Sequence, residues 1–255
     1  MKDKRKKVFV CVLNQGTISA GLESKLIDYM SALRNEYNFL FFTKYAGRPI
    51  ASNRNEIVRD FLKSDCHYLV MVDDDNPPNQ NFLKLLELNK DVIGVPTPGR
   101  NNKGVFWMVY SFTKDYPKTV VLEAFPYEKR RGLQKIDAIS TGAVIIARRV
   151  LVKLNKPFED SFDKDGVIIH SDDISFAHKV KEKGFQEWAH FDYSCSHYKT
   201  VDLLQMVAYA NNMFDRGFIK GKEYAKKLVV KKVKLEDLKK HGINGNSLKK
   251  VSWDW

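Results

Sequence analysis

The stretch that most constrains the fold is residues 68–78, in which an apolar run ends in three carboxylates, an asparagine and two prolines. The β-branched and aromatic residues 68–72 predict a strand, because the run is too short for a helix. Pro77 and Pro78 prevent its continuation. Open α/β sheets bind ligands beyond the carboxyl ends of their strands, so Asp73, Asp74 and Asp75 are predicted to face a binding crevice.

Adjacent carboxylates repel one another unless a cation or a network of hydrogen bonds compensates them. In an extended segment Asp73 and Asp75 point to the same side, and two oxygen ligands from one side suit Mg²⁺ or Mn²⁺. The alternative is an acidic turn that caps the following helix.

The rest of the chain alternates between strand and helix patterns. Apolar runs at 8–13, 39–42 and 92–95 predict strands, and helical spacing of apolar residues predicts helices near 22–33, 51–62, 82–88 and 172–183. This alternation predicts an α/β fold, doubly wound, with a mostly parallel sheet and helices on both faces. Residues 106–122 are expected to add a small antiparallel part. Residues 136–147 read as one strand that Gly142 interrupts, where a ligand or another backbone approaches closely or a bulge forms.

The formal net charge of +12 is concentrated at the two ends of the 255-residue chain. Residues 1–7 hold five Lys and Arg against one acid, residues 220–250 hold eleven against three, and the segment between them is nearly balanced. We therefore expect one main domain over 1–219, to which the resemblance described below assigns the catalytic role, and a basic extension over 220–255. Such ends can bind DNA, an anionic polymer or a membrane surface, or can be merely solvated.

Cysteine usage and hydropathy bear on location. Cys11, Cys66 and Cys195 form no CxxC pair, which favours a reducing, cytoplasmic environment over a disulfide framework or a zinc cage. No apolar run approaches the ~18 residues of a membrane span, so neither membrane insertion nor secretion is expected.

Five segments in order carry a resemblance to a known family. They are Arg48-Pro-Ile-Ala-Ser-Asn-Arg54-Asn55, Asp73-Asp74-Asp75, Asp137-Ala-Ile-Ser-Thr-Gly142-Ala143, Ser171-Asp172-Asp173-Ile-Ser-Phe and Cys195-Ser-His197. Over about residues 8 to 200 the chain resembles the GT-A fold of nucleotide-sugar glycosyltransferases, and more narrowly glycosyltransferase family 2 and its phage-type relatives.

The resemblance implies a metal site and a base. Asp73 and Asp75 would form the DxD motif that reaches Mn²⁺ or Mg²⁺ on the nucleotide diphosphate, and His197 would be a further metal ligand. Asp172-Asp173 replaces the more common Glu-Asp pair, and Asp173 would remove the proton from the acceptor hydroxyl. The alternative for both acids is stabilisation of a helix N-terminus.

The remaining predicted contacts are to the nucleotide sugar, and they fall on residues Asn14, Gly16, Arg48, Arg54, Asn55, Asp73, Asp74 and Gly142. The resemblance thus predicts a metal-dependent glycosyltransferase with a nucleotide-sugar donor, UDP-linked by preference, that inverts the anomeric carbon. The acceptor would be a hydroxymethylated DNA base, which would indicate phage DNA modification, or a glycan. The alternatives are a retaining enzyme of the same fold, a sugar nucleotidyltransferase and a non-catalytic nucleic-acid-binding protein.

Overall fold

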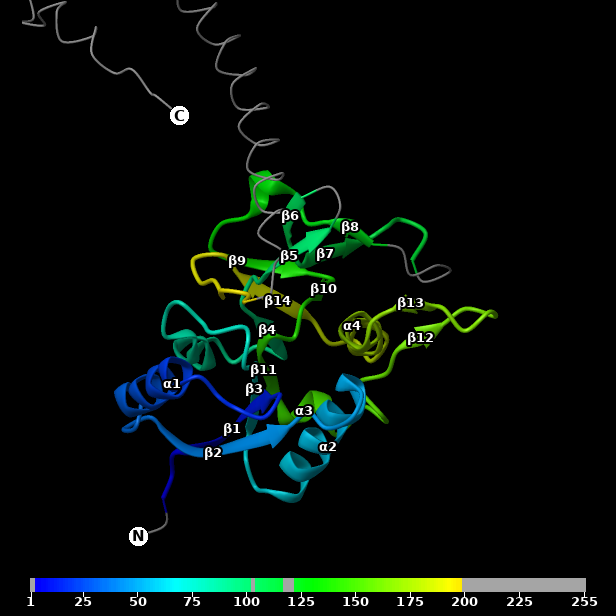
Figure 1. The fold of residues 1–255 in the computed structure, drawn as a ribbon. Helices are drawn as coiled ribbons and strands as arrows, with labels where there is room; N and C mark the ends of the chain where they lie inside the picture. The colour runs from blue at the N-terminus through cyan, green and yellow to red at the C-terminus, as the bar shows by residue number, and fades with distance from the viewer. Residues whose placement is uncertain (1–2, 102–103, 117–121, 199–255) are drawn as a thin grey trace, which may run out of the picture. The chain divides into compact units, whose positions relative to one another are not determined.

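The structure is a computed structural model that describes residues 3–101, 104–116 and 122–198 (Figure 1). These residues belong to one compact unit, Met1–Lys199. The predicted boundary at 219 and the basic extension 220–255 lie outside the described residues and stay predictions. Among the described helices, none combines the length and the apolar character that crossing a membrane requires.

A seven-stranded sheet forms the centre of the unit. Its strands are, in spatial order, β2 (Tyr37–Tyr45), β1 (Lys6–Asn14), β3 (Tyr68–Asp73), β11 (Ala143–Ala147), β4 (Val92–Gly94), β14 (Glu187–His190) and β9 (Leu133–Ile136). β2, β1, β3, β4 and β14 run in one direction, whereas β11 and β9 run in the opposite direction. The predicted α/β class with a mostly parallel sheet is confirmed.

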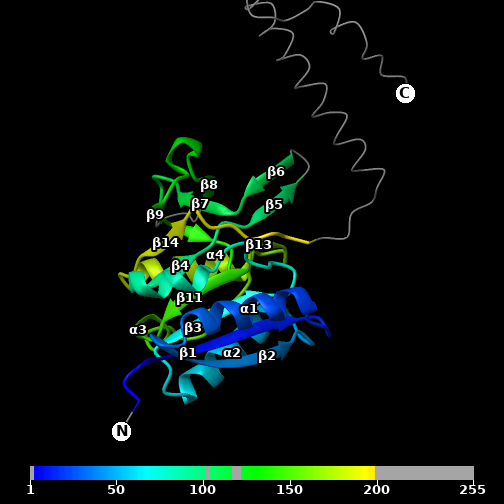
Figure 2. The same cartoon turned by 90° about the vertical axis from the view of Figure 1, so that its left-hand side faces the viewer.

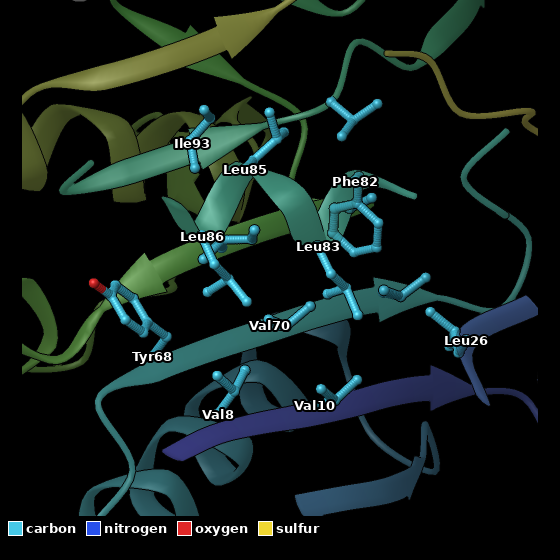
Figure 3. Packing of buried hydrophobic residues seen from close by; sticks show 14 of the residues in the cluster. Val8, Val10, Leu26, Tyr68, Val70, Phe82, Leu83, Leu85, Leu86 and Ile93 are labelled. Atoms are coloured by element: carbon cyan, nitrogen blue, oxygen red, sulfur yellow. The ribbon is translucent and has the colours of Figure 1, made fainter. Parts of the chain in front are cut away.

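The central strands are buried on both faces, which is why they read as continuous apolar runs. In β1 the side chains alternate between two cores, with Val8 and Val10 on one side and Phe9 and Cys11 on the other. The first core is closed by α1 (Ala20–Ala32) and by the 3₁₀ helix η1 (Phe82–Leu88). Figure 3 shows leucines of η1, among them Leu83, packed against β1 and β3. Burial of each such side chain contributes about 1.5–3 kcal/mol.

The second core is covered by helices of the opposite face, as was predicted (Figure 2). These helices are α2 (Ile50–Lys63), α3 (Arg148–Leu151) and α4 (Asp172–Glu182). Their innermost side chains include Phe61 of α2 and Phe176 of α4, which are fully buried. The central strands are therefore held between two apolar layers, and their ends are open to ligands.

Three small antiparallel sheets and a second 3₁₀ turn complete the unit. The sheets contain β10 (Ala138–Ile139), β7 (Val109–Phe112) and β8 (Leu122–Ala124); β5 (Pro98–Asn101) and β6 (Gly104–Trp107); and β12 (Ser161–Phe162) and β13 (Ile168–His170), and the 3₁₀ turn is η2 (Tyr127–Lys129). Strands β5 to β8 gather at one end of the unit, beside β9 and β14 (Figures 1 and 2). The predicted antiparallel addition is thus present.

One local prediction was wrong, and two further elements differ in detail from the expectation. Residues 136–147 do not form one strand, because Ser140–Gly142 separate β10 from β11 and the two strands belong to different sheets. β11 also runs antiparallel between β3 and β4, which a simple alternation of strands and helices does not predict. Residues 82–88 are helical, but as a 3₁₀ helix.

Candidate functional site

A pocket of about 140 Å³ opens at the carboxyl ends of β1 and β3. Five of the residues predicted to form the site line it: Asn14, Asp73, Asp74, Asp75 and His197. Gln15, Ala46, Asn76, Met108 and Ser140 are also in its wall. The strand ends thus bring together all three residues that the resemblance assigned to the metal and three of those assigned to the nucleotide sugar.

The backbone turns immediately after β3. The Asp74 amide donates to the Leu13 carbonyl at 2.9 Å and extends the ladder with β1, and the Asn76 amide then donates to the Asp73 carbonyl at 2.9 Å. The expectation that an extended backbone aims Asp73 and Asp75 together was therefore wrong, because a turn separates them. The three acids still face one pocket.

His197 reaches this pocket on a segment that pairs with the turn. The amides of Ser196 and Tyr198 donate to the carbonyls of Pro77 and Asp75, at 3.0 Å and 2.8 Å. Pro77 cannot donate a hydrogen bond of its own, so it serves this pairing only through its carbonyl. The result is that His197, remote in sequence, lies against Asp75.

The imidazole of His197 is fixed in one orientation. Its Nδ1 lies 2.6 Å from the Pro98 carbonyl oxygen, which can only accept a hydrogen bond, so Nδ1 carries the proton. The other nitrogen, Nε2, faces Asp75 Oδ2 at 3.5 Å. In the neutral ring Nε2 presents a lone pair to a carboxylate, an arrangement that is favourable only with a proton or a cation between them.

Arg54 lies beneath the acids and not in the pocket wall. Its Nη2 donates to Asp73 Oδ2 at 2.8 Å and its Nη1 to Asp172 Oδ2 at 2.7 Å. The side chains of Arg54 and Asp172 are only 6% and 5% exposed. Burial disfavours the charged guanidinium, but the two carboxylates outweigh it and raise the pKa of Arg54.

One cation does not neutralise the acids around it. Arg54 faces Asp73 and Asp172, while Asp75 and Asp173 lie close by. Burial raises the pKa of Asp73, Arg54 opposes the shift, and Asp75 and Asp172 add to it, so that the net direction is upward. An excess of negative charge at a strand end favours a cation.

Asp173 occupies the first turn of α4, next to the buried Asp172. It is partly exposed, and its Oδ1 accepts hydrogen bonds from the Ser171 hydroxyl and, at 2.9 Å, from the Ile174 amide. Burial raises the pKa of Asp173, and Asp172 contributes, although these hydrogen bonds and Arg54 oppose the shift. Neither acid lines the pocket at the end of β3.

The other predicted residues divide between the pocket and the framework. Asn14 is buried in the pocket wall, where its Oδ1 accepts from the Gly16 amide at 3.0 Å and its Nδ2 donates to the Lys44 carbonyl at 3.2 Å. Arg48 is exposed and ion-paired with Glu56. These contacts fix the loop after β1, while the predicted nucleotide contacts of Asn14, Gly16 and Arg48 stay predictions.

Asn55 and Gly142 have clear packing roles. The Asn55 amide group donates to the Phe158 carbonyl at 2.6 Å and accepts from the Phe158 amide at 3.1 Å. A Cβ on Gly142 would lie 2.4 Å from Asn76 Oδ1, so the close approach predicted there is made by a side chain. The nucleotide contacts predicted for Asn55, Arg54 and Gly142 stay predictions.

Sequence reasoning missed Asn76. Its Nδ2 donates to Asp75 Oδ1, and its buried Oδ1 has no hydrogen-bond partner within the described part of the chain. An asparagine beside an acidic turn is unremarkable in sequence, although its position directly after the third carboxylate was a usable signal. Asn76 thus orients Asp75, and its buried Oδ1 lies against Gly142.

The residues fit a divalent cation only in part. Within the described ranges no three His, Cys, Asp or Glu side chains form a cluster that could hold a metal, and Asp73 is bonded to Arg54. Asp75 and His197 supply one oxygen and one nitrogen at 3.5 Å. Two ligands bound at right angles, each ~2.1 Å from one ion, would be about 3 Å apart. A two-ligand site completed by water and phosphate oxygens is typical of Mg²⁺.

Comparison with known proteins gives no family. No protein-family description and no curated protein matches the sequence. Among solved structures, the chain is similar to the protein A197 from STIV, with 18% identity, a TM-score of 0.47 and coverage of 76% of this chain and 86% of that one.

Two enzymes are similar at lower identity. GalNAc-T7, crystallised with UDP, GalNAc and Mn²⁺, has 11% identity and a TM-score of 0.46 over 78% of this chain and 45% of that one. A UDP-glucose pyrophosphorylase complexed with UDP-glucose has 9% identity and a TM-score of 0.40 over 83% of this chain and 99% of that one. Both glycosyltransferases and nucleotidyltransferases are thus among the neighbours. At these scores the likeness does not decide between reactions, so the choice rests on the site.

Proposed function

We propose that this chain is a glycosyltransferase that uses a divalent cation to transfer a sugar from a nucleotide-sugar donor, UDP-linked by preference, to an acceptor hydroxyl. The observation that carries the proposal is the pair of Asp75 and His197, in which Nδ1 is bonded to a carbonyl and Nε2 faces the carboxylate at 3.5 Å. A ring nitrogen whose partner nitrogen donates to a backbone carbonyl is the usual arrangement of a metal-binding histidine.

Asp75 and His197 would hold the cation, with Asn76 keeping the carboxylate in place. Bound Mn²⁺ or Mg²⁺ would neutralise the charge on the diphosphate of the donor. Asp73 has a different task in this proposal, because its Oδ2 bonds to Arg54. It would contribute to the acidic wall of the pocket and, through Arg54, hold the end of β3 to α2 and α4.

The chemical step transfers one sugar and one proton. The bond between the anomeric carbon and the phosphate oxygen breaks, a bond from the acceptor oxygen to that carbon forms, and the nucleoside diphosphate leaves with the electron pair. Asp173 takes the proton of the acceptor hydroxyl. It suits this role better than Asp172, since it is partly exposed and has a raised pKa, whereas Asp172 is buried against Arg54.

A base on the acceptor side implies inversion of the anomeric carbon. The product anomer, determined by NMR, tests this part of the proposal, and a retained configuration would remove Asp173 from the role of base.

The decisive experiment measures UDP binding calorimetrically with and without Mn²⁺. Binding is expected to depend on Mn²⁺ and to weaken by at least about ten-fold in Asp75→Asn and His197→Ala, as loss of a metal ligand or its support does. Asp65→Asn is the control, since Asp65 pairs with Lys7 on the surface. UDP binding that is unaffected by metal and by both site variants would refute the proposal.

Turnover then separates transfer from nucleotidyl chemistry. Nucleotide release is followed with UDP-, GDP- and dTDP-sugars and Mn²⁺. Release of nucleoside diphosphate is the glycosyltransferase result. Formation of nucleoside triphosphate from nucleotide sugar and pyrophosphate would instead identify a nucleotidyltransferase.

A further inference from the structure

A second and larger pocket lies at the same edge of the central sheet. Its volume is about 520 Å³, and its wall is formed by residues that follow β4 and β14 and by residues that precede β9. β9 runs opposite to β14, so its beginning lies where β14 ends. Both pockets therefore lie at the end of the sheet where its parallel strands finish, and the order of these strands can be followed in Figure 2.

The distance between the two pockets follows from the strand order. Asp73 ends β3, and β11 separates β3 from β4, after which β14 follows. Neighbouring strands are ~4.8 Å apart, which places the ends of β4 and β14 about 10–15 Å from the acids along the sheet edge. That separation is the length of a short oligosaccharide.

Four aromatic residues define the chemistry of this second pocket: Trp107, Tyr127, Phe191 and Tyr193. Tyr127 is 82% exposed, which is unusual for a side chain of its size. An aromatic-lined concavity with a few polar groups is the general form of a small-molecule site. Flat aromatic faces suit the apolar C–H faces of a sugar ring.

Three of the four aromatic rings are held in place by packing. Phe191 stacks on Phe125 with ring centroids 5.5 Å apart, and Tyr193 meets the His190 ring edge-on at 4.9 Å. Trp107 is partly buried against the cluster that contains Val109 and Phe125. Rigid side chains lose little conformational entropy on binding, so the wall is preorganised for a ligand.

Polar groups line the same pocket. They are Gln80, Glu128, Arg130, Asp192 and Ser194. The Arg130 guanidinium is oriented by hydrogen bonds from Nε and Nη2 to the Phe125 carbonyl, at 3.0 Å and 2.7 Å. Planar amide, carboxylate and guanidinium groups can each bond to two neighbouring hydroxyls. Such groups between aromatic rings match a ligand with many hydroxyls.

The charge of the wall argues against a nucleic acid. Glu128 and Asp192 carry two negative charges against the single positive charge of Arg130. Nucleic-acid sites draw most of their affinity from lysine and arginine on phosphates, and this wall has an acidic excess. The wall therefore favours a neutral, polyhydroxylated ligand.

We propose that this aromatic pocket binds a sugar ring of the acceptor, so that the acceptor is a neutral glycan and not DNA. The inference rests on the proposed glycosyltransferase function, because a glycan in this pocket is an acceptor only if the neighbouring site binds the sugar donor. The acceptor chain would extend from the aromatic pocket toward Asp75, with its reactive hydroxyl beside the donor.

The test measures binding of neutral hexose and N-acetylhexosamine oligosaccharides, and of a single-stranded oligodeoxynucleotide, to the full chain. Tyr127→Ala and Glu128→Gln alter exposed side chains and should leave folding intact. Phe162→Ala is the control, because Phe162 is 57% exposed on β12 and does not line this pocket. UDP binding with Mn²⁺ is measured in parallel.

The expected result is binding of at least one oligosaccharide, weakened about ten-fold by Tyr127→Ala, as for an interfacial aromatic anchor. Glu128→Gln should weaken it less, and Phe162→Ala should not change it. UDP binding should be unchanged in all three. The inference is overturned if no oligosaccharide binds, or if Tyr127→Ala leaves oligosaccharide affinity unchanged. It is also overturned if the oligonucleotide displaces the oligosaccharide and its own binding is weakened by Tyr127→Ala. If UDP fails to bind while oligosaccharides do, the glycosyltransferase proposal is lost and with it the role of the glycan as acceptor, whereas sugar binding by the aromatic pocket stands.

Discussion

Replacing Arg54 by methionine tests whether the buried ion network positions the acids of the site. The methionine fills similar volume but removes the cation from between Asp73 and Asp172, whose oxygens lie 2.8 Å and 2.7 Å from the guanidinium. The side chain of Arg54 is 6% exposed, that of Asp73 17% and that of Asp172 5%. Water therefore cannot replace the guanidinium as a partner of the two carboxylates. Removing one member of such a buried ion network lowers the free energy of unfolding by about 3–5 kcal/mol.

The loss should be visible as a lower midpoint of thermal unfolding. For a unit of this size, a change of 1 kcal/mol corresponds to about 2–4 °C, so the midpoint should fall by ~6–20 °C at neutral pH. Arg149→Met is the matched control, because Arg149 pairs with Asp91 at the same 2.7 Å but is 46% exposed. A surface pair contributes at most about 1 kcal/mol.

The pH dependence distinguishes an electrostatic cause from a packing defect. Burial raises the pKa of Asp73, and loss of the guanidinium should raise it further. A carboxyl with a higher pKa in the folded than in the unfolded chain, where it is about 3.9, makes stability fall as pH rises between these values. The slope is at most ~1.4 kcal/mol per pH unit for one group. In urea titrations across this range, Arg54→Met should therefore be closest to wild type at acidic pH. A deficit that does not change with pH, or one shared by Arg149→Met, would contradict the reasoning.

Three further predictions follow from single residues. Asp173→Asn should slow nucleotide release by ~10²–10⁴-fold without changing UDP affinity in Mn²⁺, and an unaltered rate would argue against its role as base. Gly142→Ala should weaken Mn²⁺-dependent UDP binding, measured calorimetrically, because the new Cβ would displace Asn76, whose oxygen is 2.4 Å away; wild-type affinity would mean that this contact relaxes freely. Burial raises the pKa of Glu187 well above its usual range, and the nearby carboxylates of Asp173 and Asp137 add to the shift. Wild-type stability should therefore decline as pH rises toward that pKa, by up to ~1.4 kcal/mol per unit, and Glu187→Gln should flatten the curve in urea titrations. A variant curve parallel to wild type would show that another group is responsible.

The strands that carry the pocket could be predicted from sequence because their apolar runs are unambiguous. β1 and β3 are buried on both faces and end in polar residues, so the runs at 8–13 and 68–72 indicated both the strands and the edge where the acids lie. The antiparallel insertion of β11 could not be predicted in this way. A doubly buried strand has the same composition in either direction, and its partners β3 and β4 are chosen by packing far from it in sequence.

Arg54 shows a signal that was present but was interpreted differently. It lies on the same stripe of α2 as Ala51, Val58 and Phe61, all of which are buried. An arginine on the apolar face of a helix requires a buried acidic partner, which argues for an internal ion pair over a contact with nucleotide. Its two partners lie 19 and 118 residues away, so the sequence indicates that partners exist but not which ones.

Asp73 and Asp75 are therefore held in different ways in this fold. Asp73 is the last residue of β3, and its carboxylate is bound downward to Arg54, which also holds the N-terminal turn of α4 through Asp172. Asp75, beyond the turn, is oriented by Asn76 and faces His197. The first acid thus ties the strand to α4, where Asp173 lies, and the second points into the pocket. One short acidic segment couples the position of the proposed base to that of the proposed cation site, because both depend on where β3 ends.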